Sequence, residues 1–500
     1  MLQLPVLFSF VTIIVAGGFA LNTHGIQFPY FWHPDEIGKV DQVLTGQYNF
    51  YHPQLLLHAA SVLKKVSGAA DTVRETVIVG RFVSAGATAI ATAAFATIVF
   101  RRYGPAFGAI TAILIAITPS VFLNAHYFKE DASLLMGVAL TMLAMQSVEA
   151  KPERKNIIFL GLALGLTLSA KYVGAFMIIP VIALLIFRVK LGQMVLCLAI
   201  AALLFLCINS PGIIGRSSLM SGLAYEFRHV TTSHGGVAWG PTSLGALKLF
   251  MNSTSIAIIC LWLWGLIASL TRWKNQSRAD GKAIPFECLL FLTPCLLLMA
   301  NQFSMVNLPR YFVTATALVT VSAIWAVADF FSRSKRTTTR YAPIAVVAFA
   351  GASLLWSFSA TASVFHSDPR ANLAVWIANN LPPDAKIAQD FYSGLPTADR
   401  AARDPEIKLL PQSVTTAYFH MGAAGSFTAL RSQGYTHMVI SSGGFDRFYD
   451  STAKLDSKAI DQKKFFDEVF RILRPVYEMP KKSDVDFVLS SRILVYDLRN

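Results

Sequence analysis

The 500-residue sequence is poor in charge. Only 14% of its residues are charged, while 54% are hydrophobic. A soluble globular domain carries about 25% charged residues, so this deficit excludes that class and indicates a protein embedded in a membrane. The net charge of +14 does not indicate a nucleic-acid partner, because the basic residues form short clusters between apolar runs, as cytoplasmic loops of membrane proteins do.

Cysteines and nucleotide-binding motifs are also scarce. The five cysteines lie in or beside apolar runs without metal-ligand spacing, which predicts membrane packing rather than a disulfide framework: Cys197, Cys207, Cys260, Cys288 and Cys295. The sequence contains no G-x-x-x-x-G-K-[ST], no G-x-S-x-G and no H-E-x-x-H. Nothing in it therefore indicates an ATP-driven motor or a hydrolase triad.

Apolar runs long enough to cross a bilayer as helices recur as far as Thr361. We predict about eleven spans, at 4–21, 77–100, 105–123, 132–148, 156–170, 173–188, 192–208, 244–270, 285–301, 311–330 and 341–361. The first run lacks a preceding basic region, which favours an uncleaved helix over a cleaved signal peptide. Between 156 and 188, the apolar pattern also fits one missed or split span.

The connectors alternate in charge, which predicts the sidedness of the chain. Basic connectors at 101–102, 151–155, 188–190, 272–278 and 333–340 are placed in the cytoplasm. The outer connectors are then 22–76, 124–131, Lys171, 209–242, 302–310 and the residues after 362. They carry nearly all the polar groups of chemical interest. Because nucleotide-sugars are scarce on the outer side, a reaction there needs a substrate that the membrane delivers already activated.

After His366 the composition becomes that of a soluble domain. Segments 386–390, 437–441 and 493–497 predict strands, and 370–380 and 461–474 predict amphipathic helices. We therefore expect a mainly α, polytopic helical bundle at 1–365, with a large first outer loop at 22–76. A small α/β domain at 366–500 follows it on the outer side.

The first outer loop carries an adjacent acidic pair, Asp35 and Glu36, after His33 and Pro34. A second His-Pro pair begins at His52. A carboxylate there can act as a general base, hold a metal ion or orient a substrate amine. The alternative is structural, because Pro followed by two acids is also a typical helix start.

The second outer connector ends in Lys129, Glu130 and Asp131. The lysine can hold a phosphate as a point charge, and either acid can bind a sugar hydroxyl or a metal ion. The alternative is a helix N-terminus whose acids compensate the helix dipole.

Three cations, Arg81, Lys171 and Arg310, interrupt apolar runs or open them. Charges at such depths are costly, so they usually face a cavity or a partner. Together they predict a pocket for a lipid phosphate, to which the planar guanidinium of Arg310 is well suited. The alternative is that they reach to the membrane interface.

A further outer segment, 225–240, combines Glu226, His229 and His234 with a Gly-Gly break. These residues can contact substrate as part of a covering loop. As an alternative, the two histidines and the glutamate can bind a divalent metal ion. No other cofactor is indicated, and the metal requirement is not decided by the sequence.

Several of these features together resemble the GT-C superfamily of membrane glycosyltransferases. They are the acidic pair in a long first outer loop, the second-loop sequence NAHYFKED, the span-opening NLPRYF and a C-terminal domain that begins DPRANLAVWIANNLPPDAKI. The pattern is most similar to protein O-mannosyltransferases and their bacterial relatives, which include aminoarabinose transferases acting on lipid A. The sequence shows no repeat domain like that of the eukaryotic members, which favours a bacterial or archaeal member. Of the two, we expect a bacterial member in the inner membrane.

The resemblance implies a polyprenyl-phosphate-linked sugar as donor, used on the periplasmic face. It implies that Asp35, with Glu36 beside it, is the acid that acts as base or orients the acceptor. Asp131 corresponds to the acid of the second loop, and Arg310 to a cation near the lipid phosphate. Arg81, Lys129 and Lys171 are further phosphate-binding candidates.

We therefore predict an inverting glycosyltransferase whose acceptor is a lipid, a glycan or a protein. His52, Glu130, Glu226, His229 and His234 are its expected substrate-binding residues. The alternative is a transporter or lipid flippase. That class usually has repeated halves and ionisable residues near the bilayer midplane, whereas here the acids gather in outer loops.

Overall fold

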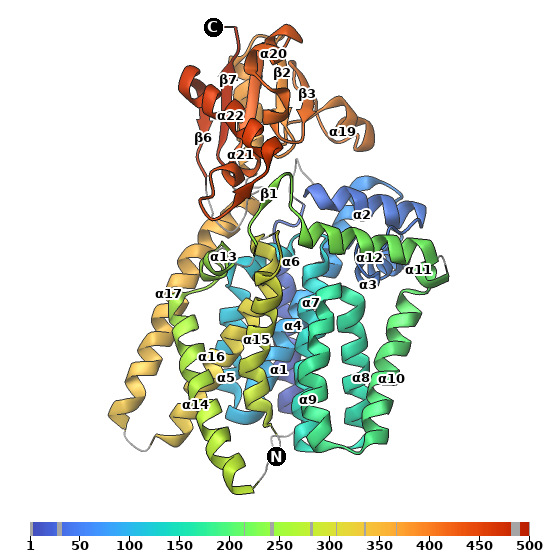
Figure 1. Cartoon of the computed structure of the whole chain (residues 1–500), viewed down its shortest axis with the longest axis vertical. Helices are drawn as coiled ribbons and strands as arrows, with labels where there is room; N and C mark the ends of the chain where they lie inside the picture. The colour runs from blue at the N-terminus through green and yellow to red at the C-terminus, as the bar shows by residue number, and fades with distance from the viewer. Residues whose placement is uncertain are drawn as a thin grey trace.

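A computed structural model of the chain describes residues 4–27, 33–214, 216–240, 245–280, 284–306, 308–334, 337–366, 368–481 and 491–499. The aromatic start of the first outer loop, residues 28–32, lies outside the described residues. The described part forms a bundle of long helices, with a small α/β domain over one end (Figure 1).

The helices of the bundle, long and short, lie within or overlap the predicted spans. They are α1 (Leu4–Thr23), α4 (Val73–Tyr103), α5 (Pro105–Ala116), α6 (Pro119–Ala125), α7 (Glu130–Ala150), α8 (Arg154–Ala170), η1 (Tyr172–Met177), α9 (Ile178–Arg188), α10 (Leu191–Ile208), α13 (Gly245–Asn252), α14 (Ile256–Asp280), α15 (Phe286–Gln302), η2 (Pro309–Phe312), α16 (Val313–Arg333) and α17 (Thr337–His366). Within the described residues, seven helices are long and apolar enough to cross a membrane, or eight if a bent pair is one span. The chain is an integral membrane protein, and the count of eleven stays a prediction.

Two predicted spans are interrupted. The span expected at 105–123 bends by 69° between α5 and α6. Thr118 is extended because Pro119 follows it, and the residue before a proline disfavours the helical region. The span expected at 244–270 breaks between α13 and α14 at Ser253–Ser255, where hydroxyl side chains compete for the backbone.

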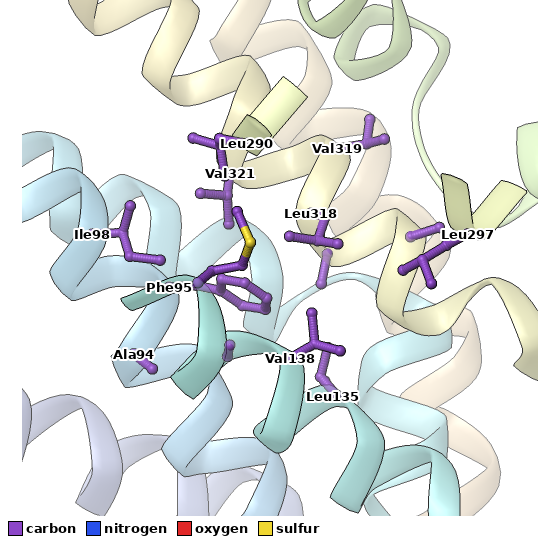
Figure 2. Close-up of a cluster of buried hydrophobic side chains, with 14 of the residues drawn as sticks. Ala94, Phe95, Ile98, Leu135, Val138, Leu290, Leu297, Leu318, Val319 and Val321 are labelled. Atoms are coloured by element: carbon purple, nitrogen blue, oxygen red, sulfur yellow. The ribbon is translucent and has the colours of Figure 1, made fainter. Parts of the chain in front are cut away.

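The centre of the bundle is formed by α4, α7 and α16. Figure 2 shows side chains of these helices and of α15 meeting around Phe95. Small residues allow the helices to approach closely, as is common in membrane bundles. For example, a Cβ on Gly137 of α7 would lie only 2.7 Å from the Thr167 Cα of α8. This close packing fixes the ends of α4, α7 and α16, from which several of the charged candidates project.

Short helices lie between the bundle and the α/β domain (Figure 1). They are α2 (Pro34–Thr45), α3 (Leu55–Ser67), α11 (Ser210–Ile214) and α12 (Arg216–Thr231). Val66 of α3 and Phe227 of α12 are exposed, as expected for amphipathic helices that lie in the membrane interface. The basic connector between α9 and α10 lies at the opposite end of the bundle (Figure 1). It is therefore separated from the connectors that contain α2, α3 and α12.

The C-terminal region folds as an α/β domain. Its elements are α18 (Pro369–Asn380), β2 (Lys386–Asp390), α19 (Ala398–Arg403), β3 (Ser413–Tyr418), η3 (Met421–Ala424), α20 (Phe427–Ser432), β4 (His437–Ser441), α21 (Ser442–Phe445), η4 (Asp446–Phe448), β5 (Lys454–Leu455), α22 (Ser457–Ile472), β6 (Pro475–Met479) and β7 (Ile493–Asp497). The main sheet has the order β3-β2-β4-β7-β6. Strands β3, β2 and β4 are parallel, and β7 runs antiparallel to β4 and β6.

The three predicted strands and two predicted helices of this region are confirmed. The sequence prediction missed β3 and β6, which are the two edge strands of the sheet. Edge strands are largely exposed and carry little apolar periodicity, which is the main signal for a strand. The predicted fold class, a polytopic helical bundle with a small α/β domain, is confirmed, while the exact division at residue 365 stays a prediction.

One outer loop of the bundle is attached to the α/β domain. Strand β1 (Val237–Ala238) pairs antiparallel with β5, with Val237 opposite Leu455. The Trp239 Nε1 donates a hydrogen bond to Asp450 Oδ2 at 2.8 Å. Val237 and Trp239 also belong to the hydrophobic core of the α/β domain. The domain therefore holds the segment that follows His229 and His234.

Candidate functional site

The acidic pair lies at the start of α2, and the local sequence explains why. The His33 Nδ1 accepts a hydrogen bond from the Asp35 N–H at 3.2 Å, and the Glu36 Oε2 accepts one from the His33 N–H at 2.6 Å. With Pro34 in the first turn, this is a capping box that satisfies free N–H groups at the helix start. The structural alternative raised by the sequence is therefore present, but it leaves the Asp35 side chain free to point elsewhere.

Glu36 forms a fully buried ion pair with Arg81 of α4. The Arg81 Nη2 and Nε donate to the two Glu36 oxygens at 2.7 and 2.8 Å, and both side chains are 0% exposed. Glu36 also accepts from the Phe128 N–H at 2.8 Å, and the Arg81 Nη1 donates to the Ile26 carbonyl at 2.8 Å. The polar atoms of both side chains are thus occupied by contacts within the protein, while the catalytic role of Glu36 and the phosphate-binding role of Arg81 stay predictions. Their contacts are structural and join the first two outer loops.

Asp35 is surrounded by cations from two other parts of the chain. Its Oδ2 lies 2.6 Å from the Lys129 Nζ and 3.2 Å from the Arg310 Nη1. Lys129 immediately precedes α7, and Arg310 lies in the turn η2 that opens α16. Burial acts to raise the pKa of the Asp35 carboxyl, but Lys129 and Arg310 outweigh it and hold that pKa well below its usual range. The structure thus brings together three predicted site residues from distant segments.

Two further ion pairs line the same region. The Lys171 Nζ lies 2.8 Å from Asp131 Oδ1, and the Lys39 Nζ lies 3.0 Å from Glu130 Oε1. Asp131 and Glu130 are both buried. Lys39 was missed by the sequence prediction, although its position four residues after Asp35 on α2 places it on the same helix face. The second outer connector therefore contributes Lys129, Glu130 and Asp131 to one cluster of charges.

Tyr311 was also missed. Its ring centroid lies 4.8 Å from the Lys171 Nζ and 5.5 Å from the Arg310 Cζ. A cation over an aromatic face is attracted by the ring quadrupole, so Tyr311 orients both cations. Its position next to Arg310 in NLPRYF was the one signal from which it could have been found.

His52 and Glu226 form a further close pair near this cluster. The His52 Nδ1 is 4.0 Å from the Glu226 Oε1. Burial lowers the pKa of His52 to about 4 and raises the pKa of Glu226 to about 7. His52 is therefore neutral at physiological pH, and Glu226 exchanges its proton near neutrality.

The loop that holds His52 contains a strained residue. Phe50 has φ +53°, a conformation that is uncommon for residues other than glycine. It is held by the Tyr172 hydroxyl, which donates to the Phe50 carbonyl at 2.9 Å, and by close packing against Gly222 of α12, where a Cβ would lie 2.1 Å from that oxygen. These contacts hold the loop against α12 and maintain the strained conformation of Phe50. They place His52 next to Glu226.

His229 contacts two other rings, one face to face and one edge to face. Tyr225 stacks on His229 with ring centroids 6.1 Å apart, and the rings of His229 and His234 are 5.3 Å apart. Within the described residues, no group of three or more His, Cys, Asp or Glu side chains is arranged to hold a metal ion. A metal site at His229, His234 and Glu226 therefore finds no support in this geometry, and the metal requirement itself stays an open prediction.

The α/β domain presents further polar side chains to this loop. A Cβ on Gly235 would lie 3.1 Å from the His420 Nε2 and 3.9 Å from the Arg447 Nη1. The Arg447 Nη2 donates to the Tyr392 hydroxyl at 3.3 Å. Tyr392 follows β2 and His420 follows β3, at the carboxyl ends of parallel strands where open α/β sheets usually bind ligands. The sequence prediction did not single out these residues, because only the sheet topology brings them to one edge.

A separate cavity lies at the other end of the bundle. It has a volume of about 580 Å³ and is lined by residues of α14, α15 and α16 that include Arg272, Asp329 and Arg333. Asp329 and Arg333 lie near the end of α16, whereas Arg310 precedes its start. This cavity therefore does not belong to the charge cluster around Asp35.

The chain is similar to known membrane proteins in sequence and in fold. A family profile described as dolichyl-phosphate-mannose-protein mannosyltransferase matches residues 71–214. No curated protein sequence matches the chain significantly. Among solved structures, ArnT from Cupriavidus metallidurans in the apo state is 14% identical, with a TM-score of 0.53 over 98% of each chain.

Two further structures carry the likeness over most of the chain. ArnT from Cupriavidus metallidurans bound to undecaprenyl phosphate is 13% identical, with a TM-score of 0.50 over 97% of this chain and 98% of ArnT. The archaeal oligosaccharyltransferase AglB from Archaeoglobus fulgidus, in complex with an inhibitory peptide and a dolichol-phosphate, is 10% identical. Its TM-score is 0.53 over 89% of this chain and 70% of AglB. At these identities the likeness shows a shared fold.

Proposed function

We propose that this chain, a membrane protein with the fold of the GT-C glycosyltransferase superfamily, transfers a sugar from a polyprenyl-phosphate donor to an acceptor hydroxyl or amine. The observation that carries this proposal is the meeting of Lys129 and Arg310 on the Asp35 carboxylate, at 2.6 and 3.2 Å. An acid next to two cations provides both groups that the reaction needs, because the acceptor must lose a proton and the leaving phosphate gains negative charge.

The two cations are proposed to bind the donor phosphate. Arg310 offers a planar fork of N–H donors, which matches phosphate oxygens in two-point contacts. Lys129, whose side chain is buried, adds a second positive charge when it is protonated. Negative charge on the phosphate increases as the sugar–phosphate bond breaks, so both cations stabilise the transition state more than the ground state.

Asp35 is proposed as the general base. Its carboxylate takes the proton from the acceptor, and the acceptor lone pair attacks the anomeric carbon. The bond from that carbon to the phosphate oxygen breaks, and its electron pair leaves with the polyprenyl phosphate. Attack from the side opposite to the phosphate inverts the anomeric centre. A positioned base typically contributes about 10²–10⁴-fold to such a rate.

The other polar residues of the cluster are proposed to position the two substrates. Asp131 holds Lys171 at 2.8 Å, which adds a cation near the phosphate. Glu130, His52 and Glu226 lie near Lys171, and we propose that they hydrogen-bond sugar hydroxyls. His229, at the end of α12, and His234 precede the segment that the α/β domain holds, and they are proposed to cover the bound substrates.

The partners and the location are proposed from the comparisons and from the arrangement of the connectors. The ArnT and AglB structures contain undecaprenyl phosphate and dolichol-phosphate, respectively, which supports a polyprenyl-phosphate donor here. The acceptor is proposed to be a lipid, a glycan or a protein. The basic connector between α9 and α10 lies at the end of the bundle away from the α/β domain (Figure 1). Its position supports an orientation in a bacterial inner membrane with the charge cluster facing the periplasm.

The direct test is an assay of the purified full-length protein with a panel of polyprenyl-phosphate sugars. Mass spectrometry identifies the product, and NMR of the new linkage gives its anomeric configuration. We expect sugar transfer with release of polyprenyl phosphate and inversion. A protein that moves these lipids across proteoliposome membranes without cleaving them would instead be a flippase.

A further inference from the structure

Asp35, Glu36, Glu130 and Asp131 are each paired with a cation, but the pairs of Asp35 differ from the others in exposure. The side chain of Asp35 is 41% exposed. The carboxylate side chains of the other pairs are much less exposed, at 0% for Glu36, 9% for Glu130 and 5% for Asp131. Breaking a buried ion pair leaves an uncompensated charge in the protein interior. The pairs of Asp35 are therefore the ones that an incoming anion can exchange at least cost.

The geometry at Asp35 also matches a phosphate better than a carboxylate. Lys129 and Arg310 both contact the same oxygen, Oδ2. A phosphate offers several oxygens to the two cations, and Arg310 can then form a two-point contact. The two cations themselves are held by the protein, because Lys129 is 2% and Arg310 19% exposed. The exchangeable partner is the carboxylate.

We infer that, before donor binds, the Asp35 carboxylate occupies the position on Lys129 and Arg310 that the phosphate of the donor lipid takes. The inference rests on the proposed function and adds an order of events to it. Donor binding releases the carboxylate from the two cations, and only then is it available to the acceptor. The acceptor is thus deprotonated only when a donor is in place.

The electrostatics of the exchange agree with this order. In the free protein, the two cations hold the pKa of Asp35 well below its usual range, so it is a weak base. A phosphate that neutralises these cations removes their influence, and its own negative charge raises the pKa of a nearby carboxyl. Donor binding therefore makes Asp35 a stronger base at the time when a base is needed.

The test uses undecaprenyl phosphate as the probe and the full-length protein in nanodiscs. Asp35→Asn keeps the shape of the side chain but removes the competing charge. We expect it to bind undecaprenyl phosphate at least about tenfold more tightly than the wild type, the lower end of what one close charge pair contributes. Glu130→Gln is the matched control, because it removes the same charge from the same cluster but leaves Asp35 on its two cations. We expect a much smaller change in its Kd.

A second variant and a second measurement guard against misfolding. Asp35→Ala should change the Kd in the same direction, and the lipid should raise the melting temperature of both Asp35 variants more than that of the wild type. Equal or weaker binding by the folded Asp35 variants overturns the inference. So does an equal gain in Glu130→Gln, which would indicate a general effect of charge. If the wild type itself fails to bind undecaprenyl phosphate, the donor assignment of the proposed function fails as well.

Discussion

The Arg310 Nη1 lies 3.2 Å from the Asp35 Oδ2, although the two residues come from the first outer loop and the last connector before α16. The contact forms because α4, α7 and α16 pack at the centre of the bundle, so that the turns preceding α7 and α16 meet the start of α2. It places the acid and the cation of the proposed reaction within reach of one substrate. The predictions below test what each residue of this arrangement does.

Asp35→Asn should lower the rate of sugar transfer by about 10²–10⁴-fold, because the amide does not accept a proton from the acceptor. The protein should remain folded, as judged by its melting temperature. Glu226→Gln is the comparison variant, because the pKa of Glu226 is about 7 and this carboxyl therefore exchanges its proton near neutral pH. If Glu226→Gln loses more activity than Asp35→Asn, then Glu226 is the base.

Arg310→Ala should lower kcat/KM for the donor by about 10²–10³-fold, as expected for loss of a group that stabilises developing charge. The KM for the acceptor should change little. Arg310→Lys should recover only part of the loss, because an ammonium does not form the two-point contact. Steady-state kinetics with both substrates varied provide the measurement, and equal effects on donor and acceptor would contradict phosphate binding.

Glu36→Gln should destabilise the protein by about 3–5 kcal/mol, because it leaves the buried Arg81 guanidinium without its counter-charge. The double variant Glu36→Leu/Arg81→Met should be more stable than Glu36→Gln, since neither partner then leaves an unpaired buried charge. Thermal unfolding in detergent measures both. Glu153→Gln, in an exposed pair with Lys155, is the control and should have almost no effect. A mild effect of Glu36→Gln would contradict the structural role given to this pair.

The affinity for undecaprenyl phosphate should depend on pH through Lys129. Burial and the charge of Arg310 lower the pKa of Lys129 to about 7, although Asp35 opposes the shift. Lys129 therefore carries its charge below about pH 7 and loses it above, so binding should weaken as the pH rises from 6 to 8. The lipid phosphate also titrates, and Lys129→Arg separates the two effects because arginine stays charged. An identical pH dependence in that variant would show that Lys129 does not contribute.

The orientation in the membrane can be tested with single cysteines in a variant that lacks the five native ones. Ser432, on the exposed surface of the α/β domain, and Lys190, in the connector between α9 and α10, are both exposed and lie at opposite ends of the molecule. We expect Ser432→Cys to react with a membrane-impermeant reagent from the periplasmic side and Lys190→Cys to be protected. The reverse pattern would invert the predicted sidedness.

Much of the fold could be predicted from local patterns. The ends of α7, α8 and α10 lie within a few residues of the predicted spans, because a helix in lipid must satisfy its own backbone and be continuously apolar. The resemblance to the GT-C superfamily, first recognised from short motifs in the outer loops, is confirmed. The break at Pro119 was missed because it depends on the backbone geometry of one residue, Thr118. The edge strands β3 and β6 were missed because they are partly exposed and lack apolar periodicity.

The candidate site was predicted only in part. Asp35, Lys129 and Arg310 were named from the cost of placing charge beside a membrane, and they meet as expected. Glu36 and Arg81 gave the same signal in the sequence, yet they are paired with each other in the interior. The sequence around Lys39, Tyr311 and His420 gave almost no signal that these residues belong to a site.

The sequence by itself determined that this chain spans a membrane and which of its charges are too costly to be incidental, while the sidedness of its connectors stays a prediction. Those properties follow from the composition of short segments and from the water-free environment of the bilayer. Only the tertiary structure decided which acid meets which cation, because partners such as Asp35 and Arg310 lie on separate helices. Their distance depends on how α4, α7 and α16 pack together, and no local pattern encodes that packing.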